Sequence, residues 1–179
     1  MVSRSLTQFN LLERRLCIMI NRSSRRRAVT GFFAVVSRLG DGVVWYCLMT
    51  ILALNQGETG RIAATQMAIC GLLGVALYKF LKTRLVRERP FIVSTDIRVG
   101  IAPLDRYSFP SGHTLHAVMF TTIAVAWFPL LSALLIPFAC LIAVSRIVLG
   151  LHYPTDVAVG ALIGWGLAEA ALRFWPPVF

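Results

Sequence analysis

The sequence predicts an all-α membrane protein, a polytopic bundle of five or six helices. Hydrophobic residues make up 57% of the 179 residues and charged residues only 15%, whereas about a quarter of the residues of a soluble domain are charged. The apolar residues also gather into runs of roughly the 20 residues that a helix needs to cross a bilayer. The length of the chain suits one such bundle.

The first 27 residues are expected to form a basic amphipathic helix that lies in the membrane interface, ahead of a membrane domain over residues 28–179. Glu13, Arg14 and Arg15 make a full crossing by this helix unfavourable. A frayed cytosolic extension is the alternative. The apolar residues that share one face of the expected helix are Leu6, Phe9, Leu12, Leu16 and Ile20.

Five later runs are expected to pack as membrane helices. Residues 37–42 interrupt the first run, which therefore forms two packed helical pieces, because polar backbone at membrane depth persists only where protein covers it. Gly160 and Gly164 in the last run are four residues apart, a spacing of small residues that favours close helix packing inside the bundle. The five runs are residues 28–54, 62–80, 112–128, 130–149 and 156–174.

The charge of the chain points to the membrane surface rather than to nucleic acid. The formal net charge is +10, but the basic residues cluster at the ends of the apolar runs, so an anionic lipid or a phosphate headgroup is the expected partner. The four cysteines are scattered through apolar segments without metal-ligand spacing. The chain has eight acidic residues and no DxD pair, so neither a metal nor a cofactor is expected.

The stretch KTRLVRERP offers two cations at the end of the second run. Lys82 and Arg89 are seven residues apart, two helical turns, and are expected to project from nearly the same helical face. Pro90 is expected to end the element at Arg89. The pair suits an anion, although an ordinary basic helix end that reaches for the membrane surface is the alternative. Arg84, on another face, fits that alternative.

The stretch FPSGHTLH carries two of the three histidines of the chain. Pro110 suits the first position of a helix, whose free N–H groups then form an anion site. Gly112 lets a phosphate approach the backbone, Ser111 adds a hydrogen-bond donor, and His113 projects from the same turn. A hydrogen-bonded core histidine is the alternative for His113. His116, three residues further on, lies on the same side of the helix and could tune His113, but a packing role is favoured.

The stretch SRIVLGLHYPTD carries the third histidine. Gly150 is expected to cap one helix and Pro154 to begin the next, so the chain reverses and brings His152 near Arg146. Asp156 is then close enough to accept a hydrogen bond from one imidazole nitrogen, which leaves the other nitrogen as a nucleophile. A helix N-cap is the alternative for Asp156 and is compatible with this role.

The three stretches together suit phosphoryl transfer without a metal. The cations neutralise the equatorial oxygens of the transition state, while one histidine attacks and another protonates the leaving oxygen. In order and spacing the stretches resemble the three-part signature of the type 2 phosphatidic acid phosphatase family, whose pocket vanadium haloperoxidases share. The residues that carry the resemblance are Lys82-x6-Arg89-Pro90, Pro110-Ser111-Gly112-His113 and Ser145-Arg146-x5-His152-x3-Asp156.

The resemblance covers residues 62–174 and implies a membrane bundle that works through a phosphohistidine. It implies that His152 is the nucleophile, that Asp156 orients it, and that His113 is the general acid and then the base. It also implies a set of phosphate-binding residues. These are Lys82, Arg89, Ser111, Gly112 and Arg146.

The expected activity is hydrolysis of a lipid phosphate monoester or pyrophosphate. Phosphatidic acid, phosphatidylglycerophosphate, undecaprenyl pyrophosphate and a lipid A phosphate are the candidate substrates, and residues 90–109 are expected to gate the headgroup. A lipid phosphotransferase that uses the same phosphohistidine stays open as an alternative. The five apolar runs disfavour a haloperoxidase-like enzyme, and a non-enzymatic anion-binding protein has no need of nucleophile, orienter and acid together.

The expected location is a bacterial inner membrane. The resemblance implies that the active site faces away from the cytoplasm. Seven arginines precede Ala28, and the positive-inside rule places them in the cytoplasm. If residues 28–54 cross once, these arginines share a side with the active site, so the two indications conflict unless the N-terminal helix itself crosses the membrane.

Overall fold

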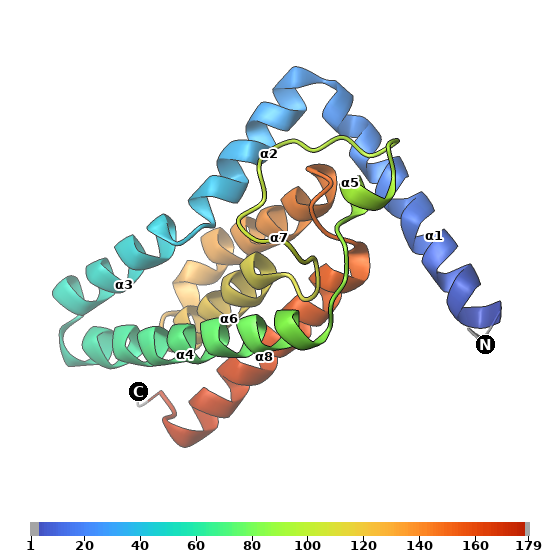
Figure 1. The fold of residues 1–179 in the computed structure, drawn as a ribbon. Coiled ribbons are helices and arrows are strands. Elements are labelled where there is room, and N and C mark those ends of the chain that lie inside the picture. Colours follow the sequence, from blue (N-terminus) through green and yellow to red (C-terminus); the bar gives the residue numbers. More distant parts are fainter. Residues whose placement is uncertain (1–3, 178–179) are drawn as a thin grey trace.

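The structure is a computed structural model that describes residues 4–177. Within that range the chain forms eight α-helices and two short 3₁₀ turns, Arg22–Arg25 and Pro129–Leu131 (Figure 1). The expected all-α membrane bundle is confirmed. The helices are α1 (Arg4–Asn21), α2 (Arg27–Leu39), α3 (Val43–Asn55), α4 (Gly57–Arg84), α5 (Pro90–Val93), α6 (Gly112–Trp127), α7 (Ser132–Val148) and α8 (Pro154–Phe174).

Three helices of the described chain are long and apolar enough to cross a membrane, namely α4, α8 and Pro129–Val148, which contains α7. The pair α2 and α3 passes the same test as one span bent by 44°, which gives four. The bend confirms the expected break at residues 37–42. Residues 112–128 were also expected to cross the membrane. The helix that they form, α6, is short for a crossing, because its 16 residues span only about 24 Å at 1.5 Å per residue.

The central element of the bundle is α6, which packs against α4, α7 and α8. Leu115, Met119 and Ile123 are fully buried along it. Gly160 and Gly164 of α8 let the two helices approach closely, because a Cβ at either position would collide with a backbone carbonyl oxygen of α6 or its cap. The close packing expected from these two glycines is therefore confirmed.

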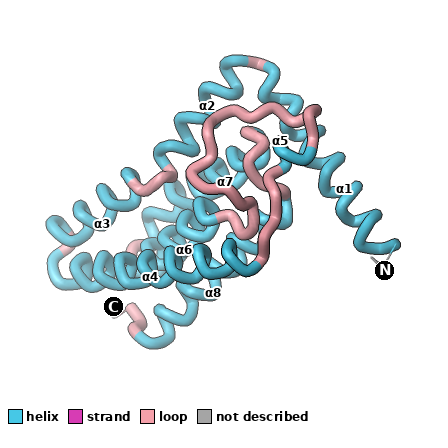
Figure 2. Tube along the Cα trace, in the orientation of Figure 1, coloured by secondary structure: helices cyan, strands magenta, loops and turns pink. Residues whose placement is uncertain are grey.

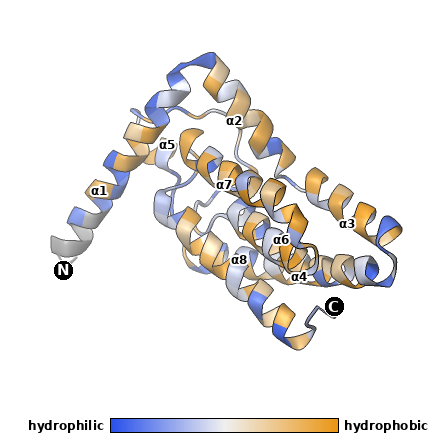
Figure 3. Cartoon of the chain, turned by 180° about the vertical axis from the view of Figure 1, so that it is seen from behind, coloured by the Kyte–Doolittle hydropathy of each residue, from blue (hydrophilic) through white to orange (hydrophobic). Residues whose placement is uncertain are grey.

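The outside of the bundle is apolar, as a bilayer requires. Figure 3 shows apolar colour along α2, α3 and α7. Leu54, Leu72 and Leu134 are exposed on three different helices. An exposed surface of this kind is stable where lipid rather than water covers it.

Helix α1 turns its polar side toward the protein. Leu12 and Leu16, from the expected apolar face, are exposed, whereas Glu13, Cys17 and Asn21 are buried against the bundle. The side chains of residues 1–7 and of residue 9 lie outside the described part. Figure 1 shows α1 at one edge of the molecule, where it packs on α7 and α8.

Two connections gather at one end of the bundle (Figure 2). Residues 85–111 contain only the short helix α5, and residues 149–153 join α7 to α8. Gly150 has φ +74° and Pro154 begins α8, as expected. The Gly100 N–H donates to the Leu149 carbonyl at 3.0 Å and ties the two connections together. Pro110 was wrongly placed at the start of a helix, because α6 begins two residues later at Gly112.

Candidate active site

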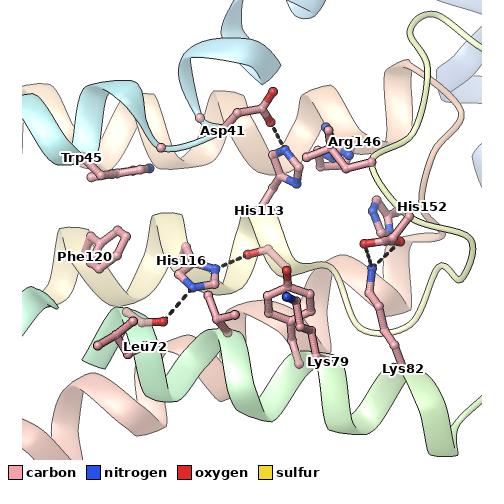
Figure 4. Close-up of a pocket in the computed structure, with 18 of the residues that line it drawn as sticks. Asp41, Trp45, Leu72, Lys79, Lys82, His113, His116, Phe120, Arg146 and His152 are labelled. Atoms are coloured by element: carbon pink, nitrogen blue, oxygen red, sulfur yellow. Dashed lines mark hydrogen bonds and ion pairs between the residues drawn. The ribbon is translucent and has the colours of Figure 1, made fainter. Parts of the chain in front are cut away.

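A cavity of about 850 Å³ opens at this end of the bundle, between α3, α4, α6 and the long connection (Figure 4). Six of the eight expected site residues line it. The other two, Ser111 and Asp156, are fully buried, and the Ser111 N–H donates to the Asp156 carbonyl at 3.0 Å. The six lining residues are Lys82, Arg89, Gly112, His113, Arg146 and His152.

Three buried cations form the polar end of the cavity. Lys82 lies in the last turn of α4 and Arg146 in the last turn of α7. Arg89 reaches the cavity from extended backbone, because α4 already ends at Arg84. Lys82 and Arg89 therefore do not share a helical face as expected, although both side chains line the cavity.

Asp105, from the long connection, contacts two of these cations. Both of its carboxylate oxygens lie 2.7 Å from Lys82 Nζ, and Oδ1 also accepts from Arg89 Nη2 at 2.7 Å. Burial opposes the ionised carboxylate, but the hydrogen bonds and charges of Lys82 and Arg89 outweigh it and hold the pKa of Asp105 below its usual value. Asp105 thus gives these cations the type of oxygen ligand that a phosphate would give them.

The imidazole of His152 is buried between Arg89 and Asp156. Arg89 Nη1 lies 3.3 Å from His152 Nε2, and a guanidinium only donates, so Nε2 is the acceptor and the proton is on Nδ1. Nδ1 faces Asp156 Oδ2 at 3.7 Å, which is too long for a hydrogen bond. Burial, then Arg146, Arg89, Lys82 and His113, lower the pKa of His152 well below its usual value. The imidazole is therefore neutral, and the lone pair of Nε2 accepts the hydrogen bond from Arg89.

The expected hydrogen bond from His152 to Asp156 is replaced by other partners in this structure. Asp156 Oδ1 accepts from Arg87 Nη1 at 2.6 Å, and Oδ2 accepts from the Tyr153 N–H at 2.8 Å. His152 Nδ1 has no hydrogen-bond partner among the described residues. Asp156 is thus held in place, but its contact with His152 would have to shorten to orient the ring, as catalytic contacts often do on substrate binding.

The break between α2 and α3 supplies two further partners to the site. The Nε2–H of His113 donates to Asp41 Oδ1, and Arg146 Nη1 donates to the buried Ser37 hydroxyl. Figure 4 shows His113 between Asp41 and the side where Arg146 and His152 lie. Sequence reasoning located the break but missed both residues. The signal available in the sequence was the presence of two polar residues, Ser37 and Asp41, within an apolar run long enough to span the membrane.

The other end of the cavity is apolar. It runs between α3 and α4 and is lined by side chains that suit a hydrocarbon chain. His116 lies beside it, with Nδ1 2.8 Å from the Gly112 carbonyl and Nε2 3.3 Å from the Gly71 carbonyl. The apolar and aromatic lining residues are Trp45, Tyr46, Met49, Leu72, Val75 and Phe120.

Two residues of the long connection behave differently from each other. Tyr107 lines the cavity, whereas Arg98 does not and instead binds Asn21 of α1 through its backbone.

Among residues 4–177, no three His, Cys, Asp or Glu side chains converge as metal ligands would.

A sequence model described as the PAP2 superfamily matches residues 62–178. Two curated proteins are similar to the chain. The undecaprenyl-diphosphatase of Sulfolobus acidocaldarius is 29% identical over 76% of this chain and 66% of its own length. The phosphatidylglycerophosphatase B of Escherichia coli K12 is 37% identical over 36% of this chain and 28% of its own length. The chain thus spans less than two thirds of either relative.

Two solved structures share the fold. Aquifex aeolicus LpxE superposes with a TM-score of 0.77 and is 32% identical, and the match covers 89% of this chain and 93% of that one. The transmembrane PAP2-type phosphatidylglycerolphosphate phosphatase of Bacillus subtilis superposes with a TM-score of 0.69 at 21% identity, over 97% of this chain and 87% of that one. The second likeness is one of fold alone.

Proposed function

Because the chain belongs to the PAP2 superfamily and is an integral membrane protein, we propose that it is a lipid phosphatase. The cavity is the single observation that carries this proposal. Three buried cations and two histidines lie at one end of the cavity. The other end of the cavity is an apolar channel between α3 and α4. This combination suits a substrate with a phosphate head and a hydrocarbon tail.

In the proposed first step, His152 Nε2 attacks the phosphorus and forms the N–P bond while the bond to the leaving oxygen breaks. The absence of a proton on Nε2 and the lowered pKa of His152 support this role, and the lone pair becomes available for attack when Arg89 turns from Nε2 to the phosphate. Lys82, Arg89 and Arg146 would take up the charge of the equatorial oxygens, and the N-terminus of α6 at Gly112 adds its N–H groups. Ser111, whose hydroxyl lies 3.0 Å from Thr114 Oγ1, would support that turn.

In the same step, His113 gives its proton to the leaving alkoxide or phosphate. His113 then accepts a proton from water, which attacks the phosphohistidine, releases inorganic phosphate and restores His152. Asp41, which accepts from His113 Nε2, supports this role because a carboxylate stabilises the protonated imidazole. An alcohol in place of the water would make the enzyme a phosphotransferase.

For the substrate we propose a polyprenyl diphosphate or a glycerolipid phosphate, phosphatidic acid and phosphatidylglycerophosphate included. The names of the Sulfolobus acidocaldarius and Escherichia coli relatives support these two classes. The apolar channel, lined by Trp45, Met49 and Phe120 among others, suits either tail.

The test is phosphate release by the purified protein from a panel of these lipids in detergent micelles, with and without an acceptor lipid. We expect release that survives EDTA, is inhibited by vanadate and is abolished by His152→Ala. Rapid quench with labelled substrate is expected to trap acid-labile, base-stable label on the protein, and His152→Ala removes it. Label that passes mainly to the acceptor lipid indicates the phosphotransferase. Activity that needs added Mg²⁺ contradicts the metal-free mechanism.

We also propose the division into an interfacial helix, residues 1–27, and a membrane domain, and a site that faces away from the cytoplasm. Asn21 binds the Val148 carbonyl, and this contact supports a position at the site end of the bundle for the four arginines that follow it, Arg22, Arg25, Arg26 and Arg27. In this orientation those arginines meet anionic headgroups of the outer leaflet. The end of α8 lies at the opposite end, so a C-terminal green fluorescent protein is expected to fluoresce from the cytoplasm. A dark fusion protein contradicts the orientation.

A further inference from the structure

One side of α1 is a buried polar stripe that contacts the segment around the proposed nucleophile. Glu13, Cys17 and Asn21 recur every four residues and therefore share one helical face, and each is at most 4% exposed. Cys17 Sγ lies 3.9 Å from the carbonyl of His152. None of these residues belongs to residues 62–178, the part that matches the family.

Asn21 joins both connections of the site. Its Nδ2 donates to the Val148 carbonyl at 2.8 Å and to the Arg98 carbonyl at 2.9 Å, while its Oδ1 accepts from the Arg98 N–H at 2.9 Å. A side-chain amide with this set of partners specifies a single arrangement of the two segments. The end of α1 is thus locked to the end of α7 and to the long connection.

Glu13 continues the same lock to the start of α8. Its Oε1 accepts from the Thr155 N–H at 2.9 Å and from the Thr155 hydroxyl, and its Oε2 accepts from Arg87 Nη2 at 2.5 Å. Arg87 Nη1 in turn donates to Asp156 Oδ1 at 2.6 Å and to Thr155 Oγ1 at 2.8 Å. The guanidinium also lies over the Tyr153 ring, 4.1 Å from its centroid. Arg87 therefore bridges two buried carboxylates from α1 and α8.

The bridge ends on the carboxylate that faces the proposed nucleophile. Asp156 Oδ1 is fixed by Arg87 and Oδ2 by the Tyr153 N–H, so the plane of the carboxylate is set by these two donors. Oδ2 is also the atom 3.7 Å from His152 Nδ1. A rotation of Asp156 would change the support for the Nδ1–H tautomer and thereby the nucleophilicity of Nε2.

We propose that Arg87 and Glu13 are positioning residues for catalysis, and that the N-terminal helix is part of the catalytic apparatus through them. This inference rests on the proposed function. Neither residue lines the cavity, so neither is expected to touch the substrate. The bridge acts through Asp156 on His152 and leaves the phosphate-binding cations alone.

The test compares purified full-length variants with matched controls. Glu13→Gln keeps the shape of the side chain and removes its charge, and Arg87→Gln removes the bridging cation. Glu88→Gln and Arg84→Gln are the controls, because both residues are exposed and neither forms an ion pair with a described residue. The measurements are kcat, KM, the inhibition constant of inorganic phosphate, the rate of label incorporation into His152 and the melting temperature.

We expect kcat and the rate of label incorporation to fall by about tenfold to a hundredfold in Glu13→Gln and Arg87→Gln, the loss that corresponds to a hydrogen bond between charged groups. KM and the phosphate inhibition constant are expected to change by less than about threefold. Arg87→Lys should recover only part of kcat, because one ammonium cannot bridge two carboxylates as a planar guanidinium does. The controls should retain the full kcat.

The outcomes separate three cases. A kcat of Glu13→Gln equal to that of Glu88→Gln overturns the inference alone. Parallel losses in kcat and in phosphate inhibition, with a lowered melting temperature, also overturn it, because they indicate a structural role only. If Glu13→Gln does not fold, Arg87→Lys, which keeps the charge, decides by the same criteria. An unaltered protein that releases no phosphate from any lipid overturns the proposed function, and the inference with it.

Discussion

Asp105→Asn is expected to tighten the binding of inorganic phosphate. Asp105 holds Lys82 and Arg89 through three contacts of 2.7 Å, and a phosphate that needs these two cations must displace it. The asparagine keeps the size of the side chain and loses its charge. A phosphate can then replace the side chain of residue 105 at Lys82 and Arg89 at a lower cost in free energy.

The structure bounds the size of this effect. The Asp105 side chain is 39% exposed, so each of its two ion pairs is treated as partly solvated and worth at most about 1 kcal/mol. Two such pairs correspond to at most about 2 kcal/mol, and hence to a phosphate inhibition constant up to about 30-fold lower in Asp105→Asn. Without phosphate the variant should melt at a lower temperature, because two buried cations lose their partner, and added phosphate should restore it.

The assay is inhibition by inorganic phosphate of p-nitrophenyl phosphate hydrolysis, with melting temperatures measured in parallel. Asp96→Asn, an exposed carboxylate of the same connection, is the control. The pKa of Asp105 is lowered, so its contribution to stability is present above the unfolded value of about 3.9 and is lost as the pH falls through the lower folded pKa. The effect should therefore persist throughout the neutral range. An inhibition constant that is unchanged or raised refutes the reasoning.

Three further predictions concern single residues. Asp41→Asn should slow phosphate release from a lipid phosphate about tenfold or more, but from p-nitrophenyl phosphate less than threefold, because only the alkoxide of the lipid needs the proton of His113 to leave. Equal losses of rate on the two substrates contradict this. Burial and nearby cations lower the pKa of His152, so below about pH 6.5 the unfolded chain binds a proton at this residue that the folded chain does not. The melting temperature should therefore fall as the pH drops below about 6.5, and an equal fall in His152→Asn contradicts this. Tyr107→Ala should change the preference among lipid phosphates, whereas Arg98→Ala should not, since only Tyr107 lines the cavity; equal changes on all substrates contradict a role in headgroup selection.

The parts of the site that lie at helix ends were predictable from sequence. Gly150 and Pro154 mark the reversal that brings His152 back beside Arg146. The structure places His152 and Arg146 at the cavity. Short-range signals of this kind work because each residue restricts its own backbone. The start of α6 was missed by two residues, because Pro110 also suits the extended segment before a helix.

The partners of the site residues were not predictable, because they come from distant parts of the chain. Glu13 reaches Thr155, and Asp41 reaches His113, across long stretches of sequence that fix no distance between them. The helical periodicity that paired Lys82 with Arg89 does not apply beyond Arg84, where α4 ends. Local patterns thus predicted residues that gather at the cavity, but only the packed fold shows which charges hold them.

The balance of charge in the cavity explains how so many ionised groups stay buried in a membrane protein. Lys82, Arg89 and Arg146 are each less than 10% exposed, and an unpaired buried cation is strongly unfavourable. Asp105 contacts the first two cations, while Arg146 donates to the neutral Ser37 hydroxyl. Arg146 Nε has no hydrogen-bond partner within residues 4–177. At this end of the cavity the three cations therefore outnumber the one carboxylate that contacts them, and a phosphate beside Arg146 would supply both negative charge and the missing acceptor.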